Sequence, residues 1–508
     1  MLHTKFDFND LFVFELANNH QGNLEHGLRI IREVAQVVRG ADVRSAIKLQ
    51  FRHLDSLIHP AHRVHSDNKH IPRFLATQLE ENQFHELLAE TKRQGLLTIA
   101  TPFDEPSVDL IEKLGVDVIK IGSCSANDWP LLEKISETVK PVICSTGGLL
   151  IQDIDKIVSF FTHLKVHFSL MHCVGIYPTP KEKLRLNQIE VLKRRYPGIT
   201  IGFSTHEEPV NKDAIQVAYA KGARIFEKHV AIPTETFKIN AYSGTPTQIA
   251  AWIKAWKGAR AMCGLEDNLL PDAEELLSLR SLMRGVYTHK PLKKGALLKR
   301  ESIYFAMPAL PDQLVSGEWK DYLVAERDYE AHEAVAHIIT KKHPTPKKYI
   351  VGHIVHELKG ILNSANIPVG SSPSLELSHH YGLERFKEWG AAIIDCINRE
   401  YCKKIIIQLP GQKHPLHFHK IKEEAFQVLY GELIAEVEGR QRVLYPGDVI
   451  VVPRASWHGF RTNTGSVFEE ISTTHSNDDS FYEDKNINKM TREKRKTKLI
   501  NWGNEQFA

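Results

Sequence analysis

Polar side chains recur at the carboxyl-terminal ends of short apolar runs between residues 11 and 230. Eight such runs are present, and each ends in groups that can hold an anion, bind a metal ion or move a proton. These groups are Glu15, Lys48, Thr101, Lys120, Ser123, Ser145, His172, Tyr177, Ser204, His206, Glu227 and His229. One of them alone would most simply be a structural hydrogen-bonding residue, but repetition at eight runs predicts a shared site.

The chemistry that this set offers is anion binding beside a metal ion. Lys48 and Lys120 can hold a phosphate or a carboxylate as point charges, and the hydroxyl groups add hydrogen-bond donors for phosphate oxygens. His206 and His229 end adjacent runs, so their imidazoles can share a divalent cation that an oxygen ligand completes. A cation beside a phosphate ester indicates Lewis-acid polarisation of a carbonyl group rather than redox chemistry.

The elements that position these groups alternate regularly along the chain. The apolar runs are typical of β-strands, and stretches between them, such as residues 26–40, carry apolar residues at helical spacing and end at glycine. Eight strands alternating with helices predict an α/β fold, a closed (β/α)8 TIM barrel, whose strand ends meet at one mouth. An open doubly wound sheet is the alternative, but it rarely needs eight units, and no GxGxxG motif is present.

Length and composition limit the remaining possibilities. The chain has 508 residues, more than one hydrophobic core holds, so two to four domains are expected. The 65 lysines and arginines nearly balance 62 acidic residues, which argues against nucleic acid or an anionic membrane as the main partner. The sequence contains no apolar run long enough for a membrane span, no signal-peptide pattern and no CxxC pair. We therefore expect a cytoplasmic protein.

Residues 11–262 resemble the sialic acid (N-acetylneuraminate) and related nonulosonate synthases. Nine segments stand in the order found in that family: FELANNHQG, AIKLQF, ATPFDEPSVDLIEKLG, VIKIGS, WPLLEKI, PVICSTG, HCVGIYPTP, GFSTH and EKH. The resemblance implies that phosphoenolpyruvate condenses with an acyclic hexosamine-type aldose such as N-acetylmannosamine. The products would be phosphate and a 2-keto-3-deoxy sugar acid for surface glycans.

The resemblance also implies roles for particular residues. Glu15, Lys48, Lys120 and His206 match catalytic positions, with Glu15 handling the attacking water or a proton. The substrate-binding positions, most of them for phosphoenolpyruvate, match Thr101, Ser123, Ser145, Tyr177, Ser204 and Glu227. His206, His229 and Asn240 match the ligands of Mn²⁺ or Mg²⁺. Asn240 replaces the usual aspartate, and Ser125 and Gly175 also depart from the family pattern, so the acceptor sugar need not be N-acetylmannosamine.

Residues 280–340 resemble the antifreeze-like (SAF) domain that follows the barrel of residues 1–265 in this family. In relatives this domain reaches the active site of a partner subunit through an Arg-Pro-Gly loop, which implies a homodimer. The corresponding stretch, residues 306–309, contains no arginine. The alternative that this domain serves only as a structural cap is therefore equally open.

A second histidine-rich unit follows the linker-like residues 341–348. His417, His419, Glu424 and His458 have the spacing of cupin motifs and offer three nitrogens and one carboxylate to a divalent metal such as Mn²⁺, Zn²⁺, Fe²⁺ or Ni²⁺. We expect a cupin β-barrel over residues 345–490 and a polar, solvated tail over residues 491–508. The alternative is a degenerate cupin that keeps its histidines for packing.

The flanks of the predicted cupin, residues 383–412 and 468–484, resemble sugar isomerases of the D-lyxose isomerase type. This resemblance implies either sugar isomerisation, with Glu469 or Glu470 moving the proton, or a sugar-binding module. Two competing hypotheses concern the barrel. Lys120 could form a Schiff base in an aldolase or lyase, or the substitutions Asn240 and Ser125 could mark a catalytically inactive sugar-binding regulator.

Overall fold

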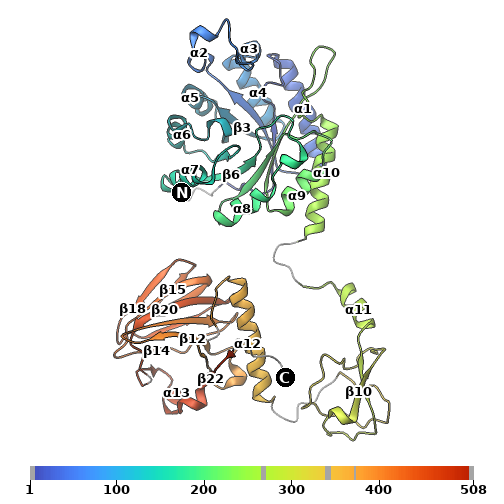
Figure 1. Ribbon diagram of the computed structural model, residues 1–508, viewed down its shortest axis with the longest axis vertical. Helices are drawn as coiled ribbons and strands as arrows, with labels where there is room; N and C mark the ends of the chain where they lie inside the picture. Colours follow the sequence, from blue (N-terminus) through green and yellow to red (C-terminus); the bar gives the residue numbers. More distant parts are fainter. Residues whose placement is uncertain (1–5, 265–269, 338–344, 371–372, 477, 503–508) are drawn as a thin grey trace. The chain divides into compact units, whose positions relative to one another are not determined.

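The computed structural model describes residues 6–264, 270–337, 345–370, 373–476 and 478–502 (Figure 1). The chain divides into two compact units, residues 1–270 and 271–508, and each is described by itself. No helix among the described residues is long and apolar enough to cross a membrane.

The first unit is a closed barrel of eight parallel strands in sequence order, in which β1 pairs with both β2 and β8. The strands are β1 (Leu11–Glu15), β2 (Ser45–Phe51), β3 (Leu97–Pro102), β4 (Val118–Ile121), β5 (Val142–Ser145), β6 (Phe168–Cys173), β7 (Ile201–Thr205) and β8 (Ile225–His229). The predicted TIM barrel is thereby confirmed, and the open sheet was the wrong alternative.

Helices surround this barrel (Figure 1). They are α1 (Leu24–Ala41), α4 (Glu81–Arg93), α5 (Glu105–Lys113), α6 (Trp129–Ser136), α7 (Ile151–His163), α8 (Asn187–Arg195), α9 (Asp213–Ala220) and α10 (Pro246–Cys263). The connection between β2 and α4 adds α2 (Leu54–Leu57), η1 (Pro60–His62) and α3 (Ile71–Ala76), and other loops add η2 (Ser123–Ser125) and η3 (Lys181–Lys183). Local sequence sets the helix ends. Asn23 caps α1 by accepting the His26 N–H, and Thr245 with Gln248 forms a capping box on α10.

Alternation along the strands places the polar groups inside the barrel. In β1, Leu11 and Val13 belong to an apolar cluster in the interior, whereas Phe12 and Phe14 pack outward with the residues of the helices. Glu15 continues the inward-facing series at the top of the strand and is buried. The apolar cluster fills the lower interior, and the charged groups close its upper end.

The second unit begins with α11 (Ala273–Ser281) and a small β-rich module. Here β9 (Gly285–Thr288) and β10 (Ile303–Ala306) pair in antiparallel fashion, with η4 (Arg300–Ser302) between them. Isolated β-bridges connect later segments of the chain to β9. They pair Gly285 with Val315 and Tyr287 with Ala334. The module has its own core, which includes Leu314. The match of this module to an SAF domain stays a prediction.

The cupin part of the second unit contains two facing sheets and α12 (Lys347–Ser364). The larger sheet has the order β18-β15-β20-β13-β12-β11-β22, and the smaller one β17-β16-β19-β14-β21. Their bounds are β11 (Leu375–Ser378), β12 (Ala391–Asn398), β13 (Tyr401–Gln408), β14 (His417–Phe418), β15 (Glu424–Gly431), β16 (Leu433–Val437), β17 (Arg440–Leu444), β18 (Val449–Val452), β19 (His458–Arg461), β20 (Ser466–Thr473), β21 (Phe481–Tyr482) and β22 (Lys496–Leu499). Short helical segments are η5 (Leu383–Arg385), α13 (Lys485–Lys489) and α14 (Arg492–Arg495). One apolar cluster joins the two sheets, and another joins α12 to the larger sheet.

The prediction of a solvated tail from residue 491 was wrong as far as residue 502. β22 pairs antiparallel with β11 at the edge of the larger sheet, and Trp502 is buried in the cluster that contains α12. Leu499 and Trp502 supply apolar area that stabilises this docking, which the charged residues before them conceal in the sequence. Residues 503–508 lie outside the described part of the chain.

Candidate functional site

At the centre of the barrel mouth, Lys48 lies between two carboxylates. Its Nζ is 2.6 Å from Glu15 Oε2 and 2.9 Å from Glu227 Oε1, and all three side chains are buried. Burial alone would lower the pKa of Lys48, but the two carboxylates outweigh it and raise that pKa. Burial alone would raise the pKa of Glu227, whereas Lys120 and Lys48 hold it well below its ordinary value. Lys48 and Glu227 are therefore ionised together.

A second lysine and several hydroxyl groups lie beside this triad. Lys120 Nζ donates to Ser145 Oγ at 2.6 Å and to the Ile121 carbonyl at 3.1 Å, while Ser204 Oγ donates to Glu227 Oε1 at 2.8 Å. Burial lowers the pKa of Lys120, and Glu227 opposes that shift. Two ammonium groups and several hydroxyls thus share one small buried volume, a donor set suited to a phosphate or a carboxylate.

Ser123 and Thr101 complete the hydroxyl set. Ser123 Oγ accepts the Gly147 N–H at 3.0 Å, and a Cβ on Gly147 would lie 2.7 Å from that oxygen, so only glycine allows the approach. Thr101 Oγ1 is buried and has no hydrogen-bond partner within the described residues. Since buried hydroxyls are normally satisfied, Thr101 is a donor available to a ligand.

The two histidines predicted as metal ligands lie together at the mouth, with ring centroids 5.3 Å apart. Burial lowers the pKa of both His206 and His229 to about 3, so both imidazoles are neutral, as metal ligands must be. His206 Nδ1 is 3.0 Å from the Val174 carbonyl, which leaves its Nε2 for a ligand. His229 Nδ1 is buried without a partner among the residues that the structure describes. The donor set of this pair fits a divalent cation, and Tyr177 packs on His206 at 4.2 Å.

Asn240 does not offer the third ligand that the sequence predicted. Its Oδ1 accepts the N–H groups of Tyr242 at 3.2 Å and Ser243 at 2.8 Å, and its Nδ2 donates to Asn19 Oδ1 at 3.2 Å. Both lone pairs of the side-chain oxygen are engaged, so Asn240 stabilises the turn after β8.

In the cupin, three strands bring four predicted metal ligands together. The ligand atoms of His417, His419 and His458 all lie within 4.8 Å of one another, and the three side chains are buried. Glu424 Oε2 is 3.0 Å from His458 Nε2, and its Oε1 is 3.4 Å from His419 Nε2. Burial holds the pKa of His417 well below its ordinary value, which favours the neutral imidazole. Three nitrogens and one carboxylate fit a divalent transition metal.

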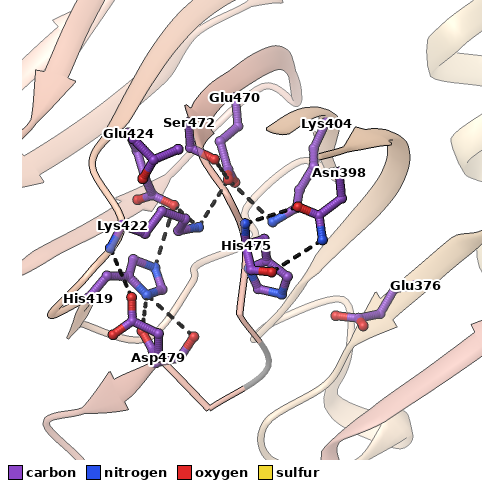
Figure 2. A network of polar contacts seen from close by, with 12 residues as sticks. Glu376, Asn398, Lys404, His419, Lys422, Glu424, Glu470, Ser472, His475 and Asp479 are labelled. Carbon is purple, nitrogen blue, oxygen red and sulfur yellow. Dashed lines mark hydrogen bonds and ion pairs between the residues drawn. The ribbon is translucent and has the colours of Figure 1, made fainter. Parts of the chain in front are cut away.

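A charged network adjoins this cluster (Figure 2). Lys422 Nζ contacts Glu424 Oε1 and lies 3.0 Å from Glu470 Oε1, and Lys404 reaches the same oxygen at 3.3 Å. Glu470 is almost fully buried and lines the same cavity as His417 and His419. Its neighbour Glu469 points to the other face of β20 and pairs with Lys403. Of the two carboxylates predicted to move a proton, only Glu470 faces the cluster.

Asp479 positions the segment that carries Lys422. Its carboxylate accepts the backbone N–H groups of Lys420, Ile421 and Lys422 at 2.8–3.2 Å, and its carbonyl contacts His419 Nδ1. One buried residue thereby fixes both a metal-type histidine and the lysine beside it. No sequence pattern indicated this role, because Asp479 lies about sixty residues from Lys420 and in a polar loop.

Comparison with known proteins places the two parts of the chain in families. The NeuB family model matches residues 33–267, and the cupin domain model matches residues 405–469. An uncharacterised protein from Methanocaldococcus jannaschii is 30% identical over 298 residues, which are 58% of this chain and 84% of that protein. The chain belongs to the NeuB family. Human N-acetylneuraminate-9-phosphate synthase is 26% identical over 300 residues, 57% of this chain and 81% of that enzyme.

A solved structure matches about two thirds of the chain. The spore coat polysaccharide biosynthesis protein E from Chromobacterium violaceum is 44% identical, with a TM-score of 0.63. The alignment covers 65% of this chain and 98% of that one.

Two strand-end residues of this NeuB barrel do not belong to the mouth. His172 Nε2 is 2.8 Å from the Leu184 carbonyl, and its ring stacks on Phe203. Lys228 Nζ pairs with Glu207 at 3.0 Å, and both side chains are buried. His172 and Lys228 each lie an odd number of positions after a residue that faces the barrel interior. Because side chains alternate along a strand, both side chains face the surrounding helices. The prediction that His172 belongs to the shared site was based on its position at a strand end and did not include the alternation of side chains along the strand.

Arg52 is a candidate binding residue that the sequence did not indicate. Its guanidinium lies between the rings of Phe74 and Phe103, at 4.1 and 4.0 Å from their centroids. It donates to Gln50 Oε1 at 2.5 Å and to Asn18 Oδ1 at 3.4 Å, and burial lowers its pKa to about 10. An arginine held this way at the edge of the mouth offers charge at a fixed position. The available signal was its place directly after β2.

Proposed function

We propose that the NeuB barrel condenses phosphoenolpyruvate with a hexosamine-type aldose to give a 2-keto-3-deoxy sugar acid and phosphate, for the synthesis of surface polysaccharides. The observation that carries this proposal is the buried donor set of Lys48, Lys120 and the hydroxyls around them. It supports a ligand with both a phosphate and a carboxylate. The synthase named among the relatives makes a sugar acid of this class.

The chain's own residues account for most of the reaction. Lys48 and Lys120 hold the anionic ends of phosphoenolpyruvate while its C3 attacks the aldehyde carbon of the sugar. The attack leaves an alkoxide on the former aldehyde carbon. Water then adds at C2 and gives a proton to Glu15, from which the alkoxide is protonated, and the C–O bond to phosphate breaks as the new C2 hydroxyl gives its proton to the departing phosphate. Glu15 is oriented for this step because its Oε1 accepts the Ala17 N–H at 2.7 Å. Bound at His206 and His229, Mn²⁺ or Mg²⁺ would supply Lewis-acid polarisation of the aldehyde.

The sugar end of the site differs from the family pattern at three positions. Asn240 is committed to a turn, Ser125 is buried in η2 and Gly175 is exposed, with open space where a side chain would lie. Tyr177 is half exposed beside the histidine pair and can contact the sugar. We infer that the acceptor is an aldose that needs no polar contact at position 175.

Product analysis tests this proposal against the Schiff-base alternative. Metal-loaded protein is incubated with phosphoenolpyruvate and a panel of hexosamines, and products are identified by mass spectrometry. We expect a sugar acid that contains all carbons of both substrates. Treatment with borohydride during turnover should leave the protein mass unchanged. A stable adduct on Lys120 would instead establish Schiff-base chemistry.

For the cupin we propose metal-dependent isomerisation of a sugar, with Glu470 moving the proton. The supporting observation is that Glu470 and Lys422 line the same cavity as His417, His419 and Glu424. The test is deuterium exchange at the carbon next to the carbonyl of candidate sugars, measured on the full chain with Mn²⁺. Glu470→Gln should abolish exchange, and Glu469→Gln, on the opposite face, should leave it unchanged. Absence of exchange in the unaltered protein would reduce the cupin to a binding role.

A further inference from the structure

The basic segment near the C-terminus forms part of the cupin cavity. Arg492 and Lys496, on α14 and β22, both contact Glu376 of β11, at 3.0 and 2.5 Å. The same cavity is lined by His417, His419 and Glu424, so the basic segment and these metal-type residues lie in one cavity. Glu376 stands apart from the Lys404–Lys422–Glu470 network in Figure 2. The cavity therefore has a metal-type end and a separate basic end.

Arg495 adjoins the cavity through Tyr482, which lines it, although Arg495 itself is not among the lining residues. Its guanidinium has donors that the described residues do not use. Arg495 lies over the ring of Tyr482, at 5.1 Å, and its Nε and Nη1 are buried without an acceptor in the described part of the chain. Burial lowers the pKa of Lys496 despite Glu376, and the neighbouring Arg492 and Arg495 add to that shift. Buried guanidinium donors without acceptors are rare and costly, so this end suits a further anion.

The charges along the cavity lead to the same conclusion. Its lining contains four cations, Lys404, Lys422, Arg492 and Lys496, and four carboxylates, Glu376, Asp395, Glu424 and Glu470. These charges balance in number over the whole lining, but they are unevenly distributed. Arg492 and Lys496 share the single carboxylate of Glu376, so two cations meet one carboxylate at the basic end. An anionic group of a ligand would supply the second negative charge there.

We propose that the cupin cavity binds an anionic sugar, whose carboxylate or phosphate is held by Arg492, Arg495 and Lys496 while its hydroxyl or carbonyl oxygens face the histidine–glutamate cluster. This inference deepens the function proposed for the cupin by naming its substrate class. It relies on that function only at the metal end. A sugar acid made by the barrel belongs to this class, so the cupin would act on, or sense, such a product.

The test measures binding to the metal-loaded full chain by titration calorimetry. The probes are D-gluconate as a sugar acid, D-glucose 6-phosphate as a sugar phosphate and D-glucitol as an uncharged equivalent. We expect one of the two anions to bind and D-glucitol not to bind. Arg495→Gln and Lys496→Gln should each weaken binding of that anion about tenfold, as the loss of a charge-assisted hydrogen bond does. Lys496→Arg, in contrast, should bind it almost as tightly as the unaltered protein. The barrel is unchanged in these variants, so any difference reports the cupin.

Lys494→Gln is the matched control, because Lys494 is exposed in the same basic segment. This variant should bind the anion as tightly as the unaltered protein does. Unchanged anion affinity in both Arg495→Gln and Lys496→Gln, with thermal unfolding midpoints showing folded protein, would overturn the proposal. So would equal binding of D-glucitol. Phosphate release by the barrel and deuterium exchange by the cupin, measured on the same samples, separate a failure of the proposed functions from a failure of this one.

Discussion

The barrel mouth and the cupin cavity use the same arrangement in two different ways. In each, a buried lysine lies between two carboxylates: Lys48 between Glu15 and Glu227, and Lys422 between Glu424 and Glu470. In the barrel, neither carboxylate touches the histidine pair in the contacts described, whereas in the cupin Glu424 belongs to both the lysine and the histidines. The residues proposed for anion binding and those proposed for metal binding thus make no direct contact among the described residues of the barrel, whereas in the cupin they share Glu424.

The largest effect should come from Lys48→Met, because it leaves Glu15 and Glu227 buried without their common cation. We expect the free energy of unfolding to fall by about 3–5 kcal/mol and turnover to fall by at least about 10³-fold. Denaturant unfolding and phosphate release measure the two effects. Lys228→Met is the control, since it breaks the buried pair with Glu207 outside the mouth. It should lose comparable stability and keep most of its turnover per folded molecule; equal loss of turnover would make the role of Lys48 merely structural.

Stability measured at low pH should distinguish the contribution of a buried carboxylate of the cupin from that of an exposed carboxylate of the barrel. Lys496 and Arg492 outweigh burial and lower the pKa of Glu376 to about 2, while hydrogen bonds from Arg195 and Tyr196 lower that of Asp155 to about 2. Both stabilising effects are present above the ordinary pKa and are lost as pH falls toward 2. Glu376→Gln should cost about 2–3 kcal/mol at pH 6, and Asp155→Asn much less, because Asp155 is exposed to screening.

Unfolding curves of both variants and of the unaltered protein, recorded between pH 6 and pH 2, measure this difference. The stability gap between each variant and the unaltered protein should close as the pH falls. A gap for Glu376→Gln that stays constant down to pH 2 would contradict the ion pairs assigned to the basic segment.

Lys422→Met tests the coupling in the cupin. Its ammonium contacts the carboxylate that the metal cluster uses, so its removal should strengthen Mn²⁺ binding there by about tenfold. Lys48→Met should strengthen Mn²⁺ binding at the barrel histidines by less, because the Lys48 ammonium acts on His206 and His229 only through space. Electron paramagnetic resonance of free Mn²⁺ during titration measures both. Weaker Mn²⁺ binding in Lys422→Met would show that the lysine supports the cluster instead of competing for Glu424.

The smallest effect concerns Asn240. Asn240→Ala removes two hydrogen bonds within one turn and should lower the free energy of unfolding by about 1–2 kcal/mol. Mn²⁺ affinity of the barrel should change little, whereas His229→Ala should lose it. A tenfold loss of Mn²⁺ affinity in Asn240→Ala would restore Asn240 as a ligand.

Strand alternation explains why the barrel site could be predicted more fully than the cupin cavity. Ser145 and Lys120 end short buried strands, so the sequence alone indicated a shared mouth. Where parity was not considered, as for His172, the prediction failed. The role of Asn240 depends on a turn that its spacing does not reveal.

In the cupin, the histidine spacing predicted the cluster, but Arg492 and Lys496 reach the cavity only because β22 pairs with β11 about 120 residues earlier in the chain. Such a long-range pairing leaves a short, charged stretch that is indistinguishable in sequence from a solvated tail. The position of Glu470 rather than Glu469 likewise required the register of β20.

Phosphate release from phosphoenolpyruvate tests the central claim most directly. Metal-loaded full chain is mixed with phosphoenolpyruvate alone and then with each of a panel of aldoses, and inorganic phosphate is followed over time. We predict no release without sugar, release with at least one hexosamine-type aldose, and loss of that release in Lys120→Gln. Folded, metal-loaded protein that releases no phosphate with any aldose would contradict the claim and favour a sugar-binding regulator.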